Sequence, residues 1–211
     1  MEEIRLSTGA CRRRLSDCGP EDCGSTMWAM TAAPQHLETM SLDQWCALGE
    51  DTAARYELVQ GVVQVSPRPR PDHSSAMIQL CLQIQRQIDR PRVCLVEFDV
   101  LVGAGPHATV RVPDVVVFDL PAAQPLPADQ VRLAIEILSP GTRRTDQVTK
   151  REEYERAGID AYWIVDLDAG PSAEILTLEG GAYRGRTERG TFTTSVPCDL
   201  SIDLDALEPL G

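Results

Sequence analysis

Residues 112–118 have the sequence Val-Pro-Asp-Val-Val-Val-Phe, and residues 131–138 have the sequence Val-Arg-Leu-Ala-Ile-Glu-Ile-Leu. Both runs are apolar, rich in β-branched residues and of strand length, so we expect them at the centre of a sheet. Each run nevertheless contains one acid, Asp114 in the first and Glu136 in the second. A buried carboxylate needs a cation, a donor or a metal ion, because leaving it unpaired costs several kcal/mol.

Two acids on neighbouring strands can bind one divalent cation, which prefers oxygen ligands and, if it is magnesium, keeps several waters. The residue pattern therefore predicts that Asp114 and Glu136 share a metal ion. The alternative is a buried ion pair of these acids with Arg111 or Arg132. Glu97, in a further expected strand, is a third acid with the same requirement.

The neighbouring segments alternate unevenly between strand and helix patterns, which predicts an α/β (mixed α+β) fold with a mixed β-sheet flanked by helices. Ser41 and Gln44 form the pattern of a capping box for a short helix that ends near Gly49. Asp72 can cap a longer helix that runs through Asp89. The other expected elements are a hairpin of 56–59 and 62–65, strands 93–102, 109–118, 161–166, 174–178, 182–186 and 191–196, and a helix 143–157.

The composition is that of a globular protein, with 43% hydrophobic and 25% charged residues among 211. No apolar run approaches the roughly 20 residues of a membrane-spanning helix, so we expect a soluble protein. The net charge of -12 repels nucleic acids and membrane surfaces at long range. Any binding of a polyanion must therefore depend on a local patch.

Seven cysteines without a CxxC pair argue against a zinc cage or a disulfide framework and favour a reducing, cytoplasmic location. Residues 1–33 show neither a helix nor a strand period, so we expect a disordered leader before one domain of residues 34–211. The leader also lacks the pattern of a secretory signal.

Lys150 is the one lysine among 20 basic residues, all the others being arginine. A position that keeps lysine in such a chain suggests a need for an amine rather than for a positive charge alone. The alternative is an ordinary i,i+4 bridge between Asp146 and Lys150 on a solvated helix, worth about 0.2–0.5 kcal/mol.

Several motifs stand in a fixed order between Ser41 and Leu207: Tyr56-Glu57-Leu58 with Gly61, Arg111–Val115, Ile135–Pro140, Asp146 with Lys150 and Tyr154, and Tyr162–Asp166. In order and spacing they resemble the Uma-type restriction-endonuclease family of the PD-(D/E)XK nuclease superfamily. The resemblance implies a restriction-endonuclease-like core. It covers the expected domain and leaves out the leader.

The resemblance implies that Asp114 and Glu136 bind Mg²⁺ or Mn²⁺ and that a lysine positions or deprotonates the attacking water. The superfamily has this lysine two residues after the second acid, where this chain has Leu138. Lys150 on the following helix is the candidate replacement. The main-chain carbonyl of Ile137 would complete the oxygen shell.

Glu57, in the opening hairpin, is the fourth catalytic candidate, because its carboxylate could hold a second ion or a water of the first. The alternative is an exposed strand glutamate.

These residue types suit phosphodiester hydrolysis, which needs neutralisation of the phosphate charge and a nucleophilic water near neutral pH. We therefore expect a metal-dependent DNA endonuclease. Two alternatives stay open. One is a catalytically inactive nuclease-fold interaction protein, which Leu138 and the net charge favour, and the other is a metallophosphodiesterase with a non-DNA substrate.

Contact with DNA would have to come from a local excess of arginine. Arg68 and Arg70 precede the long helix, and Arg143 and Arg144 follow the strand of Glu136. His73 lies at the start of the long helix, where it could face a phosphate or the active site. The alternative is a surface histidine at the start of a helix. A homodimer would let two symmetry-related sites address two DNA strands.

Overall fold

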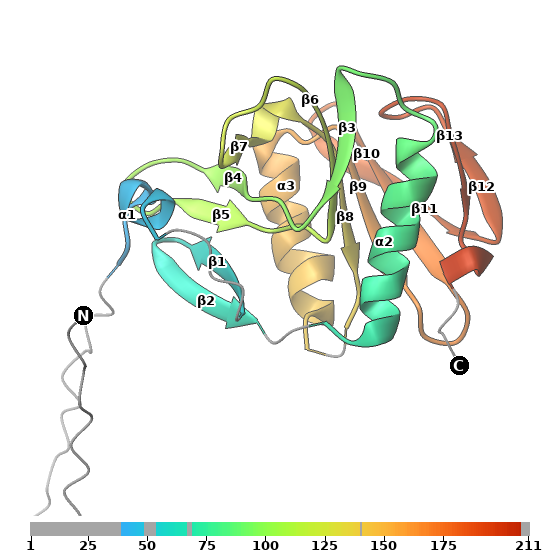
Figure 1. Ribbon diagram of the computed structural model, residues 1–211, viewed down its shortest axis with the longest axis horizontal. Helices are drawn as coiled ribbons and strands as arrows, with labels where there is room; N and C mark the ends of the chain where they lie inside the picture. Colours follow the sequence, from blue (N-terminus) through green and yellow to red (C-terminus); the bar gives the residue numbers. More distant parts are fainter. Residues whose placement is uncertain (1–38, 49–53, 67–68, 140, 208–211) are drawn as a thin grey trace, which may run out of the picture. The chain divides into compact units, whose positions relative to one another are not determined.

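The structure is a computed structural model that describes residues 39–48, 54–66, 69–139 and 141–207, all within one unit of residues 37–211. The predicted disordered leader and the expected helix end at Gly49 lie outside the described residues. The predicted mixed α+β fold is confirmed (Figure 1). Among the helices that the structure describes, none is both long and apolar enough to span a membrane.

The larger sheet has the strand order β11-β10-β9-β8-β6-β3. Its strands are β3 (Arg92–Val96), β6 (Val115–Asp119), β8 (Val131–Ile137), β9 (Ala161–Asp166), β10 (Ser172–Glu179) and β11 (Ala182–Arg189). The central strand β8 is antiparallel to β6 and parallel to β9. Parallel neighbours need a crossover connection, and here the crossover contains η2 (Thr145–Lys150) and α3 (Arg151–Ala157).

A second sheet has the order β2-β1-β5-β4-β7. Its strands are β1 (Arg55–Val59), β2 (Val62–Ser66), β4 (Val100–Gly103), β5 (Thr109–Arg111) and β7 (Leu126–Pro127). The strands β12 (Thr191–Thr194) and β13 (Leu200–Asp203) form a separate ribbon, and the remaining helical segments are α1 (Leu42–Cys46), α2 (Pro71–Gln85), η1 (Ala128–Gln130) and η3 (Asp205–Leu207).

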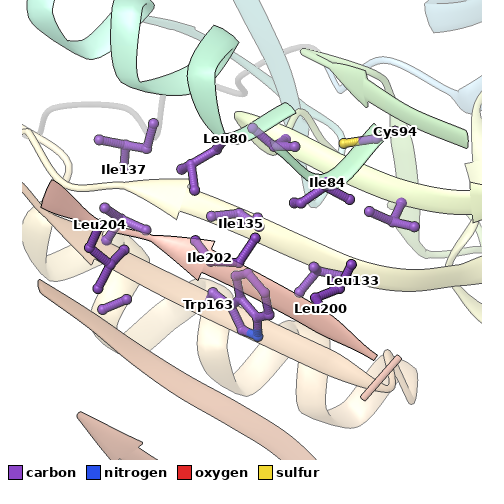
Figure 2. Packing of buried hydrophobic residues seen from close by; sticks show 14 of the residues in the cluster. Leu80, Ile84, Cys94, Leu133, Ile135, Ile137, Trp163, Leu200, Ile202 and Leu204 are labelled. Atoms are coloured by element: carbon purple, nitrogen blue, oxygen red, sulfur yellow. The ribbon is translucent and has the colours of Figure 1, made fainter. Parts of the chain in front are cut away.

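Alternate residues of β8 face two different hydrophobic cores, as the two-residue period of a strand requires. Leu133, Ile135 and Ile137 pack with α2 and β13, whereas Ala134 packs in the cluster that contains Tyr154 of α3. Figure 2 shows the first core, in which Leu80 and Ile84 of α2 lie over Ile135 and Trp163, with Ile202 of β13 beside them. The strand that bears Glu136 is therefore fixed from both faces.

Helix α2 buries Ala76, Met77, Leu80 and Ile84, which recur at helical spacing. The expected cap at Asp72 was wrong, because Arg70 occupies the N-cap position and Pro71 starts the helix. Proline suits the first helical position, where its missing N–H costs nothing.

The two strands predicted at 93–102 and 109–118 are each broken into two, and their halves lie in different sheets. Glu97 has φ +49° and is exposed, so the prediction that it is a buried acid was wrong. In the second run, Pro113 lacks the N–H that a strand ladder needs. The two breaks are adjacent, since the Glu97 N–H donates to the Asp114 carbonyl at 3.2 Å. The chain thus crosses between the sheets at Asp114.

Local sequence signals predict the smaller features well. Ser41 and Gln44 form the expected capping box of α1. Gln60 and Gly61, both with positive φ, form the two-residue turn between β1 and β2. Strand β13 was not predicted from the sequence.

Candidate active site

Three of the four predicted acids converge where the two sheets approach each other. Asp114 directly precedes β6 and Glu136 belongs to β8, and the pairing of Val115 with Ile135 places the two acids opposite each other. The Asp114 Oδ2 atom accepts a hydrogen bond from the Ile137 N–H at 2.7 Å. Glu57 of β1 is 6% exposed, so the alternative of an exposed strand glutamate was wrong.

Lys150, at the end of η2, reaches this cluster and is buried in it. Its Nζ lies 2.8 Å from Glu136 Oε1, 3.2 Å from Glu57 Oε1 and 3.4 Å from Asp146 Oδ1. The i,i+4 pair with Asp146 therefore exists, although not on a solvated face, since both residues are buried. Leu138 packs in the apolar cluster instead.

Arg55 and His73 contact the acids from the other side. Arg55 Nη1 lies 2.6 Å from Asp114 Oδ1, and its Nη2 lies 3.8 Å from Glu136 Oε2 and donates to the Val112 carbonyl. His73 Nε2 lies 3.2 Å from Asp114 Oδ2 and 3.0 Å from the Ile137 carbonyl oxygen. The cation beside Asp114 is thus neither Arg111 nor Arg132.

Sequence reasoning missed Arg55, although a signal existed. Arg55 precedes Glu57 by two positions in β1, and residues two apart in a strand share a face.

Arg111 is buried and connects Glu57 of β1 to Glu153 of α3. It donates to Glu57 Oε2 at 2.9 Å and forms a two-bond fork with Glu153 of α3 at 2.7 and 2.9 Å. The Val112 N–H donates to the other oxygen of Glu57 at 3.1 Å. The Glu57 carboxylate is therefore held in one orientation with one oxygen facing Lys150.

The arginines predicted to contact nucleic acid lie at different places around the site. Arg70 is exposed at the N-cap of α2, one turn before His73, and Arg144 is exposed just before η2. Arg143 is paired with Asp166 at 2.7 Å and with Asp168 at 2.8 Å. Arg68 lies outside the described residues.

The two central acids differ in how readily they ionise. Burial opposes ionisation of Asp114, but the His73 hydrogen bond and the Arg55 charge outweigh it and hold the Asp114 pKa at about 2. Burial raises the pKa of Glu136 against the attraction of Lys150, and the Asp114 charge adds to the rise. Burial disfavours the Lys150 ammonium, yet Glu136 and Glu57 raise its pKa above the ordinary value. Lys150 therefore stays charged.

The low pKa of Asp114 makes a prediction for stability in the absence of metal. Because the folded state favours the ionised carboxylate, Asp114→Asn should cost about 2 kcal/mol at neutral pH. A lowered carboxyl pKa stabilises the protein above the unfolded value of about 3.9 and loses this effect as the pH falls toward the folded value. Urea denaturation in EDTA should therefore show the difference between wild type and variant shrinking below about pH 4. A pH-independent difference would contradict this origin.

The donors at this site suit a hard divalent cation. Among the described residues, no three His, Cys, Asp or Glu side chains lie close enough to hold a metal by themselves. Mg²⁺, however, commonly binds through one or two carboxylates and keeps several waters. Asp114 and Glu136 supply two carboxylates, and the Ile137 carbonyl oxygen lies beside Asp114.

The charge of the cluster points the same way. The connected carboxylates are Glu57, Asp114, Glu136, Asp146 and Glu153, and the permanent cations that pair with them are Arg55, Arg111 and Lys150. The residues present therefore fit a divalent ion in donor type, with Asp114, Glu136 and the Ile137 carbonyl as its ligands, and the acids of the cluster outnumber its permanent cations.

The mixed sheet, the acid pair and the buried lysine agree with the restriction-endonuclease-like core that the sequence resemblance implies. The model of the family described as "Putative restriction endonuclease" (Uma2) matches residues 40–204, and the chain belongs to this family. The resemblance seen in the sequence is thereby confirmed, and the family supports a nuclease at a general level.

A solved structure shares the fold. It is the crystal structure of a protein from Anabaena variabilis described as a putative nuclease belonging to DUF820, with a TM-score of 0.60 and 19% sequence identity. The match covers 80% of this chain and 97% of that chain. A comparison with curated proteins found no match.

Proposed function

We propose that the protein is a metal-dependent DNA endonuclease that hydrolyses phosphodiester bonds with Asp114, Glu136 and Lys150. The observation that carries the proposal is the buried cluster in which Lys150 Nζ lies 2.8 Å from Glu136 while Asp114 lies opposite on the neighbouring strand. Family membership gives this cluster a chemical context. The acids and the lysine come from separate elements, so their convergence is a tertiary feature.

Mg²⁺ or Mn²⁺ held by Asp114, Glu136 and the Ile137 carbonyl would neutralise phosphate charge and lower the pKa of water. The protein's own part is to fix the ligands. The Ile137 N–H orients Asp114, and the Tyr154 hydroxyl donates to Glu136 Oε1 at 3.0 Å. Such supporting hydrogen bonds hold a metal-binding carboxylate in its working orientation.

Lys150 acts in this proposal as a fixed positive charge. Its raised pKa keeps it an ammonium at neutral pH, so it stabilises negative charge developing on the phosphate rather than taking a proton from water. Glu57 is a positioning residue, because it holds Lys150 while Arg111 holds Glu57.

DNA binding is expected to be weak. Arg70 and Arg144 are exposed near the site, but the net charge of -12 opposes approach of DNA. A second copy related by two-fold symmetry would bring a site to the opposite strand, so cleavage of both strands is expected from a homodimer.

The test is nicking of supercoiled DNA at low salt with Mg²⁺, with Mn²⁺ and with EDTA. Nicked product with either ion and none with EDTA supports the proposal. Nicking in EDTA, or its absence with both ions, overturns it. If neither ion supports nicking, metal-dependent hydrolysis of bis(p-nitrophenyl) phosphate would indicate a non-DNA phosphodiesterase. No hydrolysis of this compound would indicate an inactive interaction protein.

Lys150→Arg tests the role of the amine. Arginine keeps the charge, but its planar fork cannot occupy the position of a compact ammonium between Glu136 and Glu57. We expect nicking to fall about tenfold, since small displacements at a reacting centre are costly. Undiminished nicking by a folded Lys150→Arg protein would show that charge alone suffices.

A further inference from the structure

The Arg55 guanidinium contacts both of the acids that would hold the metal. One nitrogen lies 2.6 Å from Asp114 Oδ1 and the other lies 3.8 Å from Glu136 Oε2. Asp114 and Glu136 come from paired strands of the larger sheet, whereas Arg55 starts β1 of the other sheet. A permanent cation from one sheet thus bridges the acid pair of the other.

Arg55 is also more exposed than the two acids. Its side chain is 17% exposed, against 2% for Asp114 and 3% for Glu136. The guanidinium is always charged, so it cannot leave the acids by losing a proton. An ion that enters from solvent therefore meets a positive charge at the acids it must bind.

Lys150 and Arg111, the other lysine and arginine of the cluster, are placed differently. Lys150 is only 5% exposed and is held by three carboxylates, and Arg111 is 2% exposed and contacts neither Asp114 nor Glu136. Among the arginine and lysine side chains that the structure describes at this site, Arg55 alone contacts both Asp114 and Glu136, and it is more exposed than Lys150 and Arg111.

We propose that Arg55 is a built-in counter-cation that a divalent metal ion must displace from Asp114 and Glu136, so that Arg55 sets the metal affinity of the site. The inference rests on the metal site of the proposed function and adds a control of its occupancy. If the site binds metal only when Arg55 has moved away from the acids, its apparent metal affinity is the intrinsic affinity multiplied by the fraction of time that Arg55 is away. Arg55 thereby stabilises the metal-free protein and weakens metal binding.

The experiment compares Mn²⁺ binding, measured by electron paramagnetic resonance, in wild type and in Arg55→Met. Removing the competing charge should tighten Mn²⁺ binding about tenfold or more. Arg55→Lys keeps a positive charge and should bind Mn²⁺ much as wild type does. The matched control is Arg132→Met, which removes an arginine of β8 that pairs with Asp119 and Asp160, away from the acid pair.

Thermal unfolding supplies a readout that does not depend on activity. Without metal, Arg55→Met should melt below wild type, because Asp114 loses the guanidinium that pairs with it, and saturating Mn²⁺ should remove most of this difference. If Arg55→Met does not fold, Arg55→Gln takes its place, since the amide can still donate to Asp114. The inference is overturned if the neutral variant binds Mn²⁺ no more tightly than wild type, or if Arg55→Lys binds Mn²⁺ as tightly as the neutral variant.

The outcomes separate this inference from the proposed function. Tighter Mn²⁺ binding in Arg55→Met with no DNA nicking by wild type supports the counter-cation and overturns the nuclease. Metal-dependent nicking by wild type, together with an unchanged Mn²⁺ affinity in Arg55→Met, supports the nuclease and overturns the counter-cation. Absence of Mn²⁺ binding in both proteins overturns both.

Discussion

Glu136→Gln is expected to reduce metal-dependent nicking at least about 100-fold while leaving the protein folded. The amide keeps the shape of the side chain but removes the charge that binds the ion. The structure also explains why the fold should tolerate the change. Because burial raises the pKa of Glu136, the folded state already disfavours its ionised form, and a neutral side chain avoids that cost. Nicking rates at saturating Mn²⁺ and circular dichroism melting curves measure the two effects separately.

Glu97→Gln is the matched control, because Glu97 is an exposed acid that was singled out by the same sequence argument. Its nicking rate should equal that of wild type. Asp114→Asn should lose nicking as Glu136→Gln does, at a greater cost in stability. Activity that survives in both acid variants would remove these residues from the reaction.

The sequence predicts the two central strands well because their signal is local. Each is an apolar run of strand length, and an acid inside such a run is unusual because a buried carboxylate needs a partner. The division of the chain into two sheets was not predicted, because the runs 93–102 and 109–118 have strand-like, mostly β-branched or apolar residues on both sides of each break. Only the backbone at Glu97 and the missing N–H of Pro113 mark the breaks, and tertiary pairing decides where each half goes.

The candidate site was predictable to the extent that its residues are unusual in their own surroundings. Asp114 and Glu136 are acids in apolar strands, and Lys150 is a single lysine. Arg55 is not unusual in this way, since it is one arginine of many and stands at the start of β1. Its role as the partner of Asp114 depends on how β1 lies against β6, which no local pattern specifies.

Arg111→Met is expected to lower the free energy of unfolding by about 3–5 kcal/mol, the cost of breaking a buried ion pair on one side. The Arg111 side chain is 2% exposed and binds both Glu57 and Glu153, so its loss leaves Glu153 without this cation and Glu57 with Lys150 in place of two cations. Urea denaturation measures the change.

Arg143→Met is the control that separates the effect of burial from that of the ion pair itself. Arg143 forms a similar two-bond fork with Asp166 at 2.7 and 3.2 Å, but its side chain is 37% exposed. Solvent screens this pair, so its loss should cost no more than about 1 kcal/mol. If the two variants lose equal stability, burial is not what makes Arg111 important. Because most of the expected cost comes from stranded carboxylates rather than from a lost attraction, adding Glu153→Gln to Arg111→Met should recover part of the loss.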